Sequence, residues 1–405
     1  MGSNQSKDEK LPQNVPAEQE SSDIGSDDVK AVSSSSNKLT AQLFTQLCGD
    51  DDELKNHLVS GFGLSTAMAM LSLGAKEETL EEIQKCFRFN VDLEDHKYSY
   101  KETLACFVSS NSKIIVGQEI LMSDILKSFA DDVNHFLSSD TTNLEFGAPA
   151  FAFINTGLLG GDTTVGEIDT LVPAEDFKVK TPMQLLNSVY FKSDWAQKVD
   201  SSKTKVKDFY LSGDESGPKV RHEMMTRHNV AYGFVERLNA TAIELPYKGF
   251  QFSMVILLPR EKRGYEEMER NLRNIDLGKD LLIDKRADTV TMPKFKAESS
   301  NSMIPLLRPM GITTAFDGRA KFGGLSKEPS YVGVVWQKAT LEVDEKGTAA
   351  HRPRKLKRTV TLVEPATGWC PFHVRIDVNR PFVYLIRHRA SGLVLFIGRM
   401  MNPKI

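Results

Sequence analysis

Helical hydrophobic patterns occupy the first third of this chain, and strand-like patterns dominate the rest. Apolar residues recur at helical spacing in four segments, at residues 39–47, 63–73, 79–87 and 120–137. Runs typical of strands follow at residues 185–191, 241–245, 252–258, 289–292, 332–343, 382–386 and 393–400. Because helical and strand patterns are segregated rather than alternating, the sequence predicts an α+β fold with a largely antiparallel sheet.

The first 36 residues differ in composition from the rest of the chain. They are rich in Ser, Asp, Glu, Gln and Pro, and they include four consecutive serines at 33–36. Such a segment buries too little apolar surface to offset the entropy that ordering it would cost. We therefore predict a disordered polar tail over residues 1–36 and one folded domain over residues 37–405.

The chain begins with the residues MGSNQS, which fit the pattern M-G-x-x-x-[ST] for myristoylation at Gly2. A single acyl chain gives marginal, reversible membrane binding. No basic segment followed by an apolar stretch marks a secretory signal peptide. We therefore expect a cytoplasmic protein, anchored to a membrane if Gly2 is acylated and otherwise not, that reaches the extracellular space only by a non-classical route.

Composition and motifs exclude several classes of function. The net charge is −3, so the chain as a whole has no general attraction for nucleic acid or anionic lipid. The four cysteines are too sparse for a disulfide framework, and none forms a CxxC pair, which predicts reduced thiols. The motifs G-x-S-x-G, H-E-x-x-H and G-x-x-x-x-G-K-[ST] are absent. We expect no enzyme activity, no cofactor and no bound metal.

The segment Ile376–Ile386, with the sequence IDVNRPFVYLI, resembles the signature of the serpin superfamily at every constrained position. Further serpin-like blocks follow in the family's order at residues 56–73, 186–195, 244–259, 292–295, 310–313 and 338–348. The resemblance covers about residues 37–405. It implies a monomeric α+β protein with about nine helices around three β-sheets, and with an exposed reactive loop at about residues 345–375.

The resemblance also implies a mechanism. In serpins the reactive loop is offered to a serine protease, which cleaves it and stays attached as an acyl-enzyme. The freed loop then inserts as a new strand in sheet A and drags the protease to the far pole, where its active site is distorted. Each ladder hydrogen bond gained by the new strand contributes about 1 kcal/mol net. The expected partner is therefore a serine protease.

The segment that bends during such an insertion is the hinge, which here is predicted at Glu345, Gly347, Thr348, Ala349 and Ala350. It follows directly on a block that resembles strand 5A of the family. Glycine supplies backbone freedom, and the three residues after it have small side chains that can slide between two strands. A second block, which contains Trp195, resembles strand 3A. The hinge sequence favours insertion.

The segment after the hinge, His351–Arg358, opposes insertion, because five of its eight residues are Lys or Arg. Side chains alternate between the two faces of a strand. If Thr348 and Ala350 face the core on insertion, as the resemblance implies, Arg352 and Arg354 follow on the same face. An unpaired buried guanidinium costs several kcal/mol.

A proline also interrupts this basic segment, since Pro353 would remove a ladder donor from a central strand. Insertion that stops part-way, or arginines that reach a polar lower edge of the sheet, would relieve the conflict. The remaining alternative is a serpin that no longer inserts fully. The run Arg352–Arg358 is also a candidate polyanion-binding patch, or a solvated cluster that keeps the loop exposed.

The bond that the protease cleaves is predicted from the family's usual interval after the hinge. That interval gives Thr361–Leu362, or Leu362–Val363 one step further on. Both bonds suit elastase- or chymotrypsin-like proteases with apolar primary pockets. Cleavage after Arg358 would suit a trypsin-like protease, but Arg358 lies about three residues short, so it ranks second.

The shutter region, which in serpins lies beneath the strands that separate, departs from the family pattern in part. Ser60 and Asn187 match family positions that hydrogen-bond across the opening sheet. Gly61 and Gly63 stand where serpins usually have Pro and Ser, and Gln337 stands where they usually have His. Glutamine both donates and accepts hydrogen bonds. The shutter is therefore expected to be rewired rather than lost.

Two functions stay open on the sequence alone. The first is an inhibitor that traps a serine protease of the elastase or chymotrypsin type. The second is a non-inhibitory serpin that acts as a binding or carrier module, at a membrane if Gly2 is acylated. The hinge favours the first, and the basic segment after it favours the second.

Overall fold

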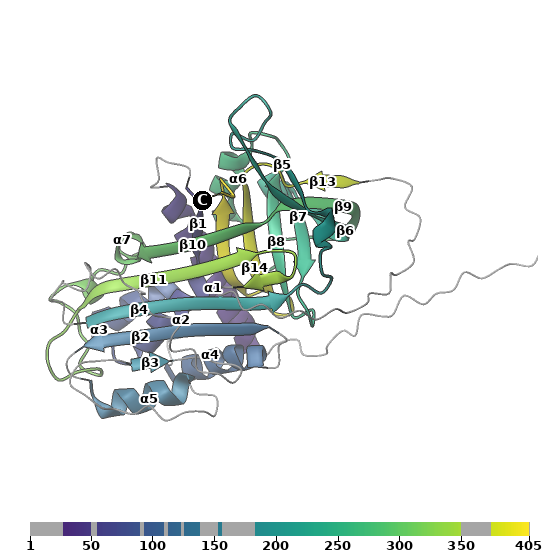
Figure 1. The fold of residues 1–405 in the computed structure, drawn as a ribbon. Coiled ribbons are helices and arrows are strands. Elements are labelled where there is room, and N and C mark those ends of the chain that lie inside the picture. The colour runs from purple at the N-terminus through teal and green to yellow at the C-terminus, as the bar shows by residue number, and fades with distance from the viewer. Residues whose placement is uncertain are drawn as a thin grey trace, which may run out of the picture.

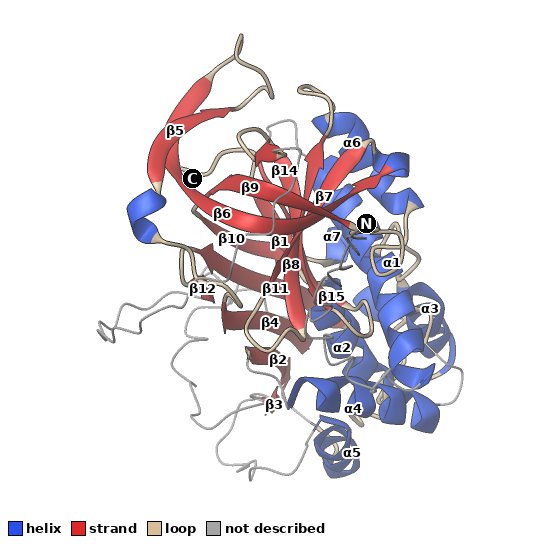
Figure 2. Cartoon of the chain, turned by 90° about the vertical axis from the view of Figure 1, so that its right-hand side faces the viewer, coloured by secondary structure: helices blue, strands red, loops and turns tan. Residues whose placement is uncertain are grey.

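The computed structural model describes residues 27–49, 55–89, 93–108, 112–122, 125–137, 153–155, 183–349 and 374–404. Helices and strands occupy different sides of the molecule, as Figure 2 shows. The described α-helices are α1 (Asp27–Gly49), α2 (Gly61–Ser72), α3 (Glu77–Phe87), α4 (Leu93–Val108), α5 (Lys127–Leu137), α6 (Tyr265–Asn271) and α7 (Ile304–Leu307).

The larger of the two sheets has nine strands in the order β1-β15-β14-β8-β7-β6-β9-β13, with β5 paired to β6. Its strands are β1 (His57–Val59), β5 (Lys205–Tyr210), β6 (Lys219–Val235), β7 (Ala240–Pro246), β8 (Phe252–Pro259), β9 (Lys285–Pro293), β13 (Arg375–Asp377), β14 (Phe382–His388) and β15 (Val394–Met400). The centre of this sheet is fully buried: every residue of β8 and β15 is buried. Continuous apolar runs such as FSMVILLP are typical of strands covered on both faces.

The second sheet has six strands in the order β10-β11-β12-β4-β2-β3 (Figure 1). Its strands are β2 (Lys113–Met122), β3 (Phe153–Asn155), β4 (Met183–Asp194), β10 (Phe295–Ser302), β11 (Val332–Val343) and β12 (Gly347–Ala349). Along β11, every second residue from Val335 to Val343 is buried. This alternation fits a strand with one face on the core.

The α+β class and the largely antiparallel pairing are confirmed. Two pairs in the described residues run parallel, β11 with β4 and β13 with β9, and the other ladders are antiparallel. Helix α2 is buried along its whole length, and the side chain of Ser60 caps its N-terminus by accepting a hydrogen bond from the Gly63 amide. The helices therefore pack on the sheets rather than forming a separate domain.

The helix predicted at residues 120–137 is wrong in its first part. Residues 113–122 form β2, which pairs with β4 over ten successive positions, and the helix begins only at Lys127. Ile114, Val116 and Ile120 are buried at two- or four-residue spacing, as a strand requires. The apolar residues at the end of β2 come only a few positions before those of α5 in the sequence. Together they imitate one continuous helical pattern, which explains the error.

The predicted boundary of the polar tail also needs correction. Helix α1 begins at Asp27, so residues 27–36, which were assigned to the tail, are helical. Val29 and Val32 are buried, and the hydroxyl of Ser33 donates to the carbonyl oxygen of Val29. A serine that bonds to its own helix in this way can pack against a core. The earlier part of the tail, residues 1–26, lies outside the described residues.

The strands that the structure describes form two sheets, where the resemblance implied three. Strand β6 pairs with β5, β7 and β9, so a single long strand joins regions that would otherwise be two sheets. The described residues contain seven α-helices, against about nine expected.

Stability should depend on pH through His388, which ends β14. Burial lowers the pKa of His388 to about 4, below the ordinary value near 6.5. Between these pH values the unfolded chain binds a proton that the folded chain excludes, so stability is complete above pH 6.5 and falls towards pH 4. We expect a loss of about 2–3 kcal/mol across this window. The variant His388→Gln, measured by urea unfolding at several pH values, should show a smaller loss, and an equal loss would contradict this origin.

Candidate functional site

Three residues of the predicted hinge, Gly347, Thr348 and Ala349, form strand β12 at one end of the six-stranded sheet. Thr348 of β12 pairs antiparallel with Val343 of β11 on one side and with Ser193 of β4 on the other. Beyond this short insertion β11 and β4 pair directly with each other, residues 332–340 against residues 183–190. The sheet is therefore open at the hinge end and closed over the rest of its length.

A tight turn carries the chain from β11 into β12. The carboxylate of Asp344 accepts hydrogen bonds from the amides of Lys346 (2.7 Å) and Gly347 (3.1 Å), and the Asp344 amide donates to the Gly347 carbonyl oxygen. A Cβ at Gly347 would lie 2.0 Å from the Ser193 carbonyl oxygen. Only glycine allows β12 to approach β4 this closely.

Trp195, at the end of β4, is 2% exposed and lies beneath the turn. Its indole nitrogen donates to the Asp344 carbonyl oxygen at 2.8 Å, and its amide donates to the Lys346 carbonyl oxygen. Its ring stacks on Tyr247 with 4.6 Å between the ring centroids. The Tyr247 hydroxyl in turn bonds to the Thr348 hydroxyl at 2.7 Å. Trp195 and the hinge thus belong to one buried network.

Glu345, the first predicted hinge residue, is anchored to neighbouring segments. Its carboxylate accepts a hydrogen bond from Thr204 at 2.9 Å and lies 3.5 Å from the ammonium group of Lys294. Burial acts to raise the pKa of Glu345, but hydrogen bonds from its own amide and from Thr204, with the charge of Lys294, hold it below the usual value. Glu345 therefore stays ionised at neutral pH and fixes the start of the turn.

The three predicted shutter residues meet beneath the closed part of the sheet. Gln337 and Asn187 are paired across β11 and β4, and their side chains are joined by a 2.5 Å hydrogen bond from the Gln337 amide nitrogen. Gln337 also accepts from the Ser60 amide and donates to the Ser60 carbonyl oxygen, both at 2.8 Å. One glutamine thus joins both strands to the start of α2.

The absence of a side chain at Gly63 permits close packing at the shutter. A Cβ there would lie 2.3 Å from Val189 and 2.8 Å from the Asn187 side-chain oxygen. Helix α2 therefore lies directly against β4. Glycine at position 63, in place of the Ser that serpins usually have, therefore allows this close approach of helix and sheet.

Several predicted residues lie outside the described residues. They include the candidate reactive-bond positions, the last hinge residue, the basic segment and the lipidation site: Thr361, Leu362, Val363, Arg358, Ala350, Arg352–Arg358 and Gly2. Their roles stay predictions. Sequence reasoning missed three residues around the hinge: Arg227, which lies over the Trp195 ring, Tyr247 and Lys294. Tyr247 and Lys294 stood in recognised blocks, which could have indicated them, whereas nothing in the sequence marked Arg227.

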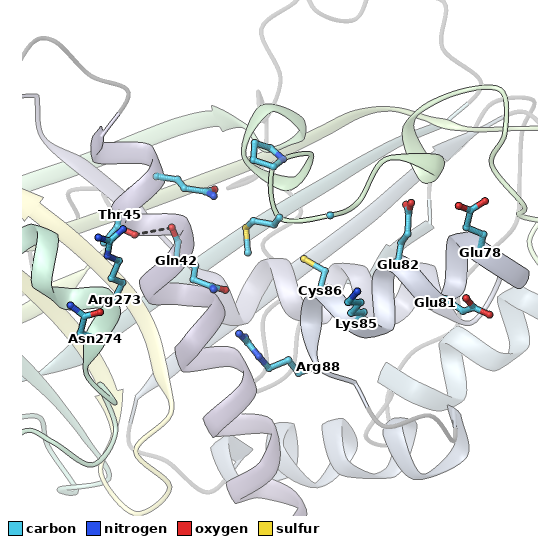
Figure 3. Close-up of a pocket in the computed structure, with 14 residues that line it drawn as sticks. Gln42, Thr45, Glu78, Glu81, Glu82, Lys85, Cys86, Arg88, Arg273 and Asn274 are labelled. Carbon is cyan, nitrogen blue, oxygen red and sulfur yellow. Dashed lines mark hydrogen bonds between the residues drawn. The ribbon is translucent and has the colours of Figure 1, made fainter.

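A polar groove of about 940 Å³ lies apart from the hinge, between α1 and α3 (Figure 3). Figure 3 shows Arg273 and Gln42 towards one end, and Glu78, Glu81 and Glu82 towards the other. Burial raises the pKa of the lining thiol Cys86 to about 11 despite the charge of Arg88, so the thiol is protonated and a weak nucleophile. None of the predicted site residues lines the groove.

Within the described ranges, no cluster of three or more His, Cys, Asp or Glu side chains is placed to hold a metal ion. Among the described helices, none combines the length and apolar character needed to cross a membrane.

Comparison with known proteins supports the same family over nearly the whole chain. The profile described as "Serpin (serine protease inhibitor)" matches residues 34–403. Iripin-8 of Ixodes ricinus is 30% identical over 393 residues, which cover 93% of this chain and 94% of the relative. The leukocyte elastase inhibitor of Homo sapiens is 27% identical over 393 residues, 93% of this chain and 100% of the relative.

Solved structures agree on the fold. Serpin48 of Tenebrio molitor matches with a TM-score of 0.73 and 22% identity, over 93% of this chain and 100% of that protein. Human thyroxine-binding globulin matches with a TM-score of 0.71 and 22% identity, over 93% and 99%. The chain belongs to the serpin family of serine protease inhibitors.

Proposed function

We propose that this protein inhibits a serine protease by offering its reactive loop as a substrate and inserting the cleaved loop into the six-stranded sheet. The observation that supports this most is the position of β12, already seated between β11 and β4. Insertion would extend β12 along the sheet by separating these two strands. Under the proposal, β12 is the segment from which this strand would grow.

The register of β12 predicts which loop side chains would enter the core. Thr348 is 1% exposed, and its partners Val343 and Ser193 are also buried. Every second residue after Thr348 would therefore face the core on insertion, which gives positions 350, 352, 354 and 356. Along this face the small Ala350 would be followed by the basic Arg352 and Arg354 and then by the apolar Leu356.

The two arginines on that face would meet different surroundings. Extending the same register places Arg352 between Val189 and Ala339, two buried apolar residues that offer no acceptor. It places Arg354 between Asn187 and Gln337, whose side-chain oxygens accept hydrogen bonds. Arg352 is therefore the main obstacle to insertion, and the shutter amides would receive Arg354.

The proposed target is a protease with an apolar primary pocket, of the elastase or chymotrypsin type, which cleaves at Thr361–Leu362. Leu362–Val363 is the nearest alternative. Cleavage after Arg358 by a trypsin-like protease is the second choice, because the shorter loop would carry the protease less far along the sheet. The proposal rests on the distance from the hinge, which sets how far an attached protease travels.

Incubation with elastase, chymotrypsin or trypsin, followed by a denaturing gel, tests the proposal. We expect a covalent band near the summed mass of the two proteins with elastase or chymotrypsin. Mass spectrometry should show that the released C-terminal peptide begins at Leu362. Complete cleavage by all three proteases without any covalent band would overturn inhibition, and a peptide that begins at Thr359 would move the bond to Arg358.

The alternative function is a non-inhibitory binding or carrier module. The groove between α1 and α3 is the observation that favours it, since its volume lies in the range of small-molecule sites, although its lining is more polar than most of them. A polyanion bound through Arg352–Arg358, a membrane bound through acylated Gly2, and a monomeric state stay predictions. Cleavage without a covalent band, combined with no gain in thermal stability, would favour this alternative.

A further inference from the structure

Arg227 of β6 is a buried cation that the proposed mechanism has not yet used. Its side chain is 6% exposed, and its Nη1 atom has no hydrogen-bond partner. Burial lowers the pKa of Arg227 to about 10, so the guanidinium remains charged at neutral pH. A buried guanidinium nitrogen left without an acceptor is costly, which calls for a compensating contact.

No carboxylate compensates this charge among the residues that the structure describes. Glu223 and Glu345 both lie against Lys294, with oxygen–nitrogen distances of 3.0 and 3.5 Å. The Asp344 carboxylate is occupied by the turn amides. Arg227 instead lies over the ring of Trp195, 5.0 Å from its centroid. A cation over an indole face is attracted by the ring quadrupole, and more strongly when both groups are desolvated.

The Trp195 contact connects Arg227 to the hinge. The ring of Trp195 stacks on Tyr247 with 6° between the planes, and the Tyr247 hydroxyl bonds to Thr348. Trp195 also donates to the turn at Asp344. These four side chains (Arg227, Trp195, Tyr247 and Thr348) form what we call the hinge network. It joins β6, the end of β4, the residue after β7, and β12.

We propose that Arg227 is a positioning residue for the hinge, which holds the Trp195–Tyr247 stack in the place from which Tyr247 retains Thr348 between β11 and β4. The significance for inhibition rests on the proposed function, but the positioning itself is a property of the uncleaved protein. An apolar side chain at 227 would fill the space without the cost of a buried charge. The presence of arginine rather than an apolar residue at 227 supports a role beyond packing.

Hydrogen exchange of the uncleaved protein, followed by mass spectrometry, measures the proposal without any protease. The variant Arg227→Met keeps an unbranched apolar stem but removes the charge. Because β12 amides are protected only while β12 stays paired, peptides covering residues 344–349 should exchange roughly tenfold faster in this variant. Arg227→Lys, which keeps the charge without the planar group, should fall between the variant and the original protein.

Two further variants separate positioning from general loss of stability. Arg380→Met removes another partly buried arginine, which donates to the Pro259 carbonyl oxygen, and should leave the exchange of residues 344–349 unchanged. Tyr247→Phe removes only the hydroxyl that bonds Thr348 and should raise the same exchange. If both side chains act through one network, the double variant should speed up hydrogen exchange of residues 344–349 by less than the product of the two single-variant factors.

Equal hinge exchange in Arg227→Met and Arg380→Met would overturn the positioning role. Independent, multiplicative effects of Arg227→Met and Tyr247→Phe would also overturn it. Covalent complex formation, measured in parallel, tests the proposed function separately. Faster hinge exchange in a protein that forms no complex would support the positioning role and contradict only the inhibition.

Discussion

Replacing Thr348 with arginine is expected to turn the protein from an inhibitor into a substrate of the same protease. Thr348 is 1% exposed and bonded to the Tyr247 hydroxyl, so an arginine there would bring a charged guanidinium into the core with no carboxylate to neutralise it, and β12 could stay between β11 and β4 only at that cost. That burial costs several kcal/mol and should slow insertion by roughly a hundredfold. The protease would then complete hydrolysis before the loop could insert. The covalent band on a denaturing gel should vanish while cleavage continues.

The matched control for Thr348→Arg is Lys346→Arg, which places an arginine on the exposed turn of the same hinge. It should trap the protease as well as the original protein does. Trapping that persists in Thr348→Arg would mean that β12 does not extend into the sheet after cleavage. Loss of trapping in both variants would point to the turn itself rather than to burial.

Replacing Gln337 with leucine is expected to lower the free energy of unfolding by about 2–4 kcal/mol. The glutamine side chain makes three hydrogen bonds, to the Ser60 amide, the Ser60 carbonyl oxygen and Asn187. Leucine has a similar size but leaves all three buried groups without this partner. Urea unfolding at neutral pH gives the measurement, and a nearly unchanged midpoint would show that the shutter contributes little.

A control on the same strand is Thr340→Val, which changes a half-buried position away from the shutter and should cost less than 1 kcal/mol. The variant Gln337→His offers a second comparison. Histidine is the residue that serpins usually have at this position, and its ring can hydrogen-bond to the same groups. It also introduces a titratable side chain into the shutter. We expect its stability to vary between pH 5 and 8 more than that of the original protein.

Much of the fold could be predicted because its central strands are long and apolar. The segments that form β8, β14 and β15 are buried on both faces, and they appeared as clear strand patterns. Strand β6 was missed because its first residues, KVRHE, alternate exposed charged side chains with half-buried ones and resemble a polar segment. Pairing with β5, β7 and β9 stabilises it, and pairing partners distant in sequence leave no local pattern.

The candidate site, too, could be predicted from the sequence only in part. The family resemblance indicated Ser60, Asn187 and Gln337, but their hydrogen bonds follow from the register between β11 and β4, which sequence reasoning could not fix. The hinge residues were predicted, whereas their insertion as β12 depends on the approach of Gly347 to Ser193. Arg227 could not be predicted, since its burial results from contacts among segments far apart in the chain.

The central claim is that the cleaved loop becomes a strand between β11 and β4. Thermal unfolding before and after cleavage of the reactive loop tests this most directly, because a new central strand adds buried surface and ladder hydrogen bonds. We predict that the cleaved protein unfolds at a temperature at least 10 °C higher than the intact protein, at roughly 2–4 °C per kcal/mol gained. An unchanged or lower unfolding temperature after complete cleavage would contradict insertion.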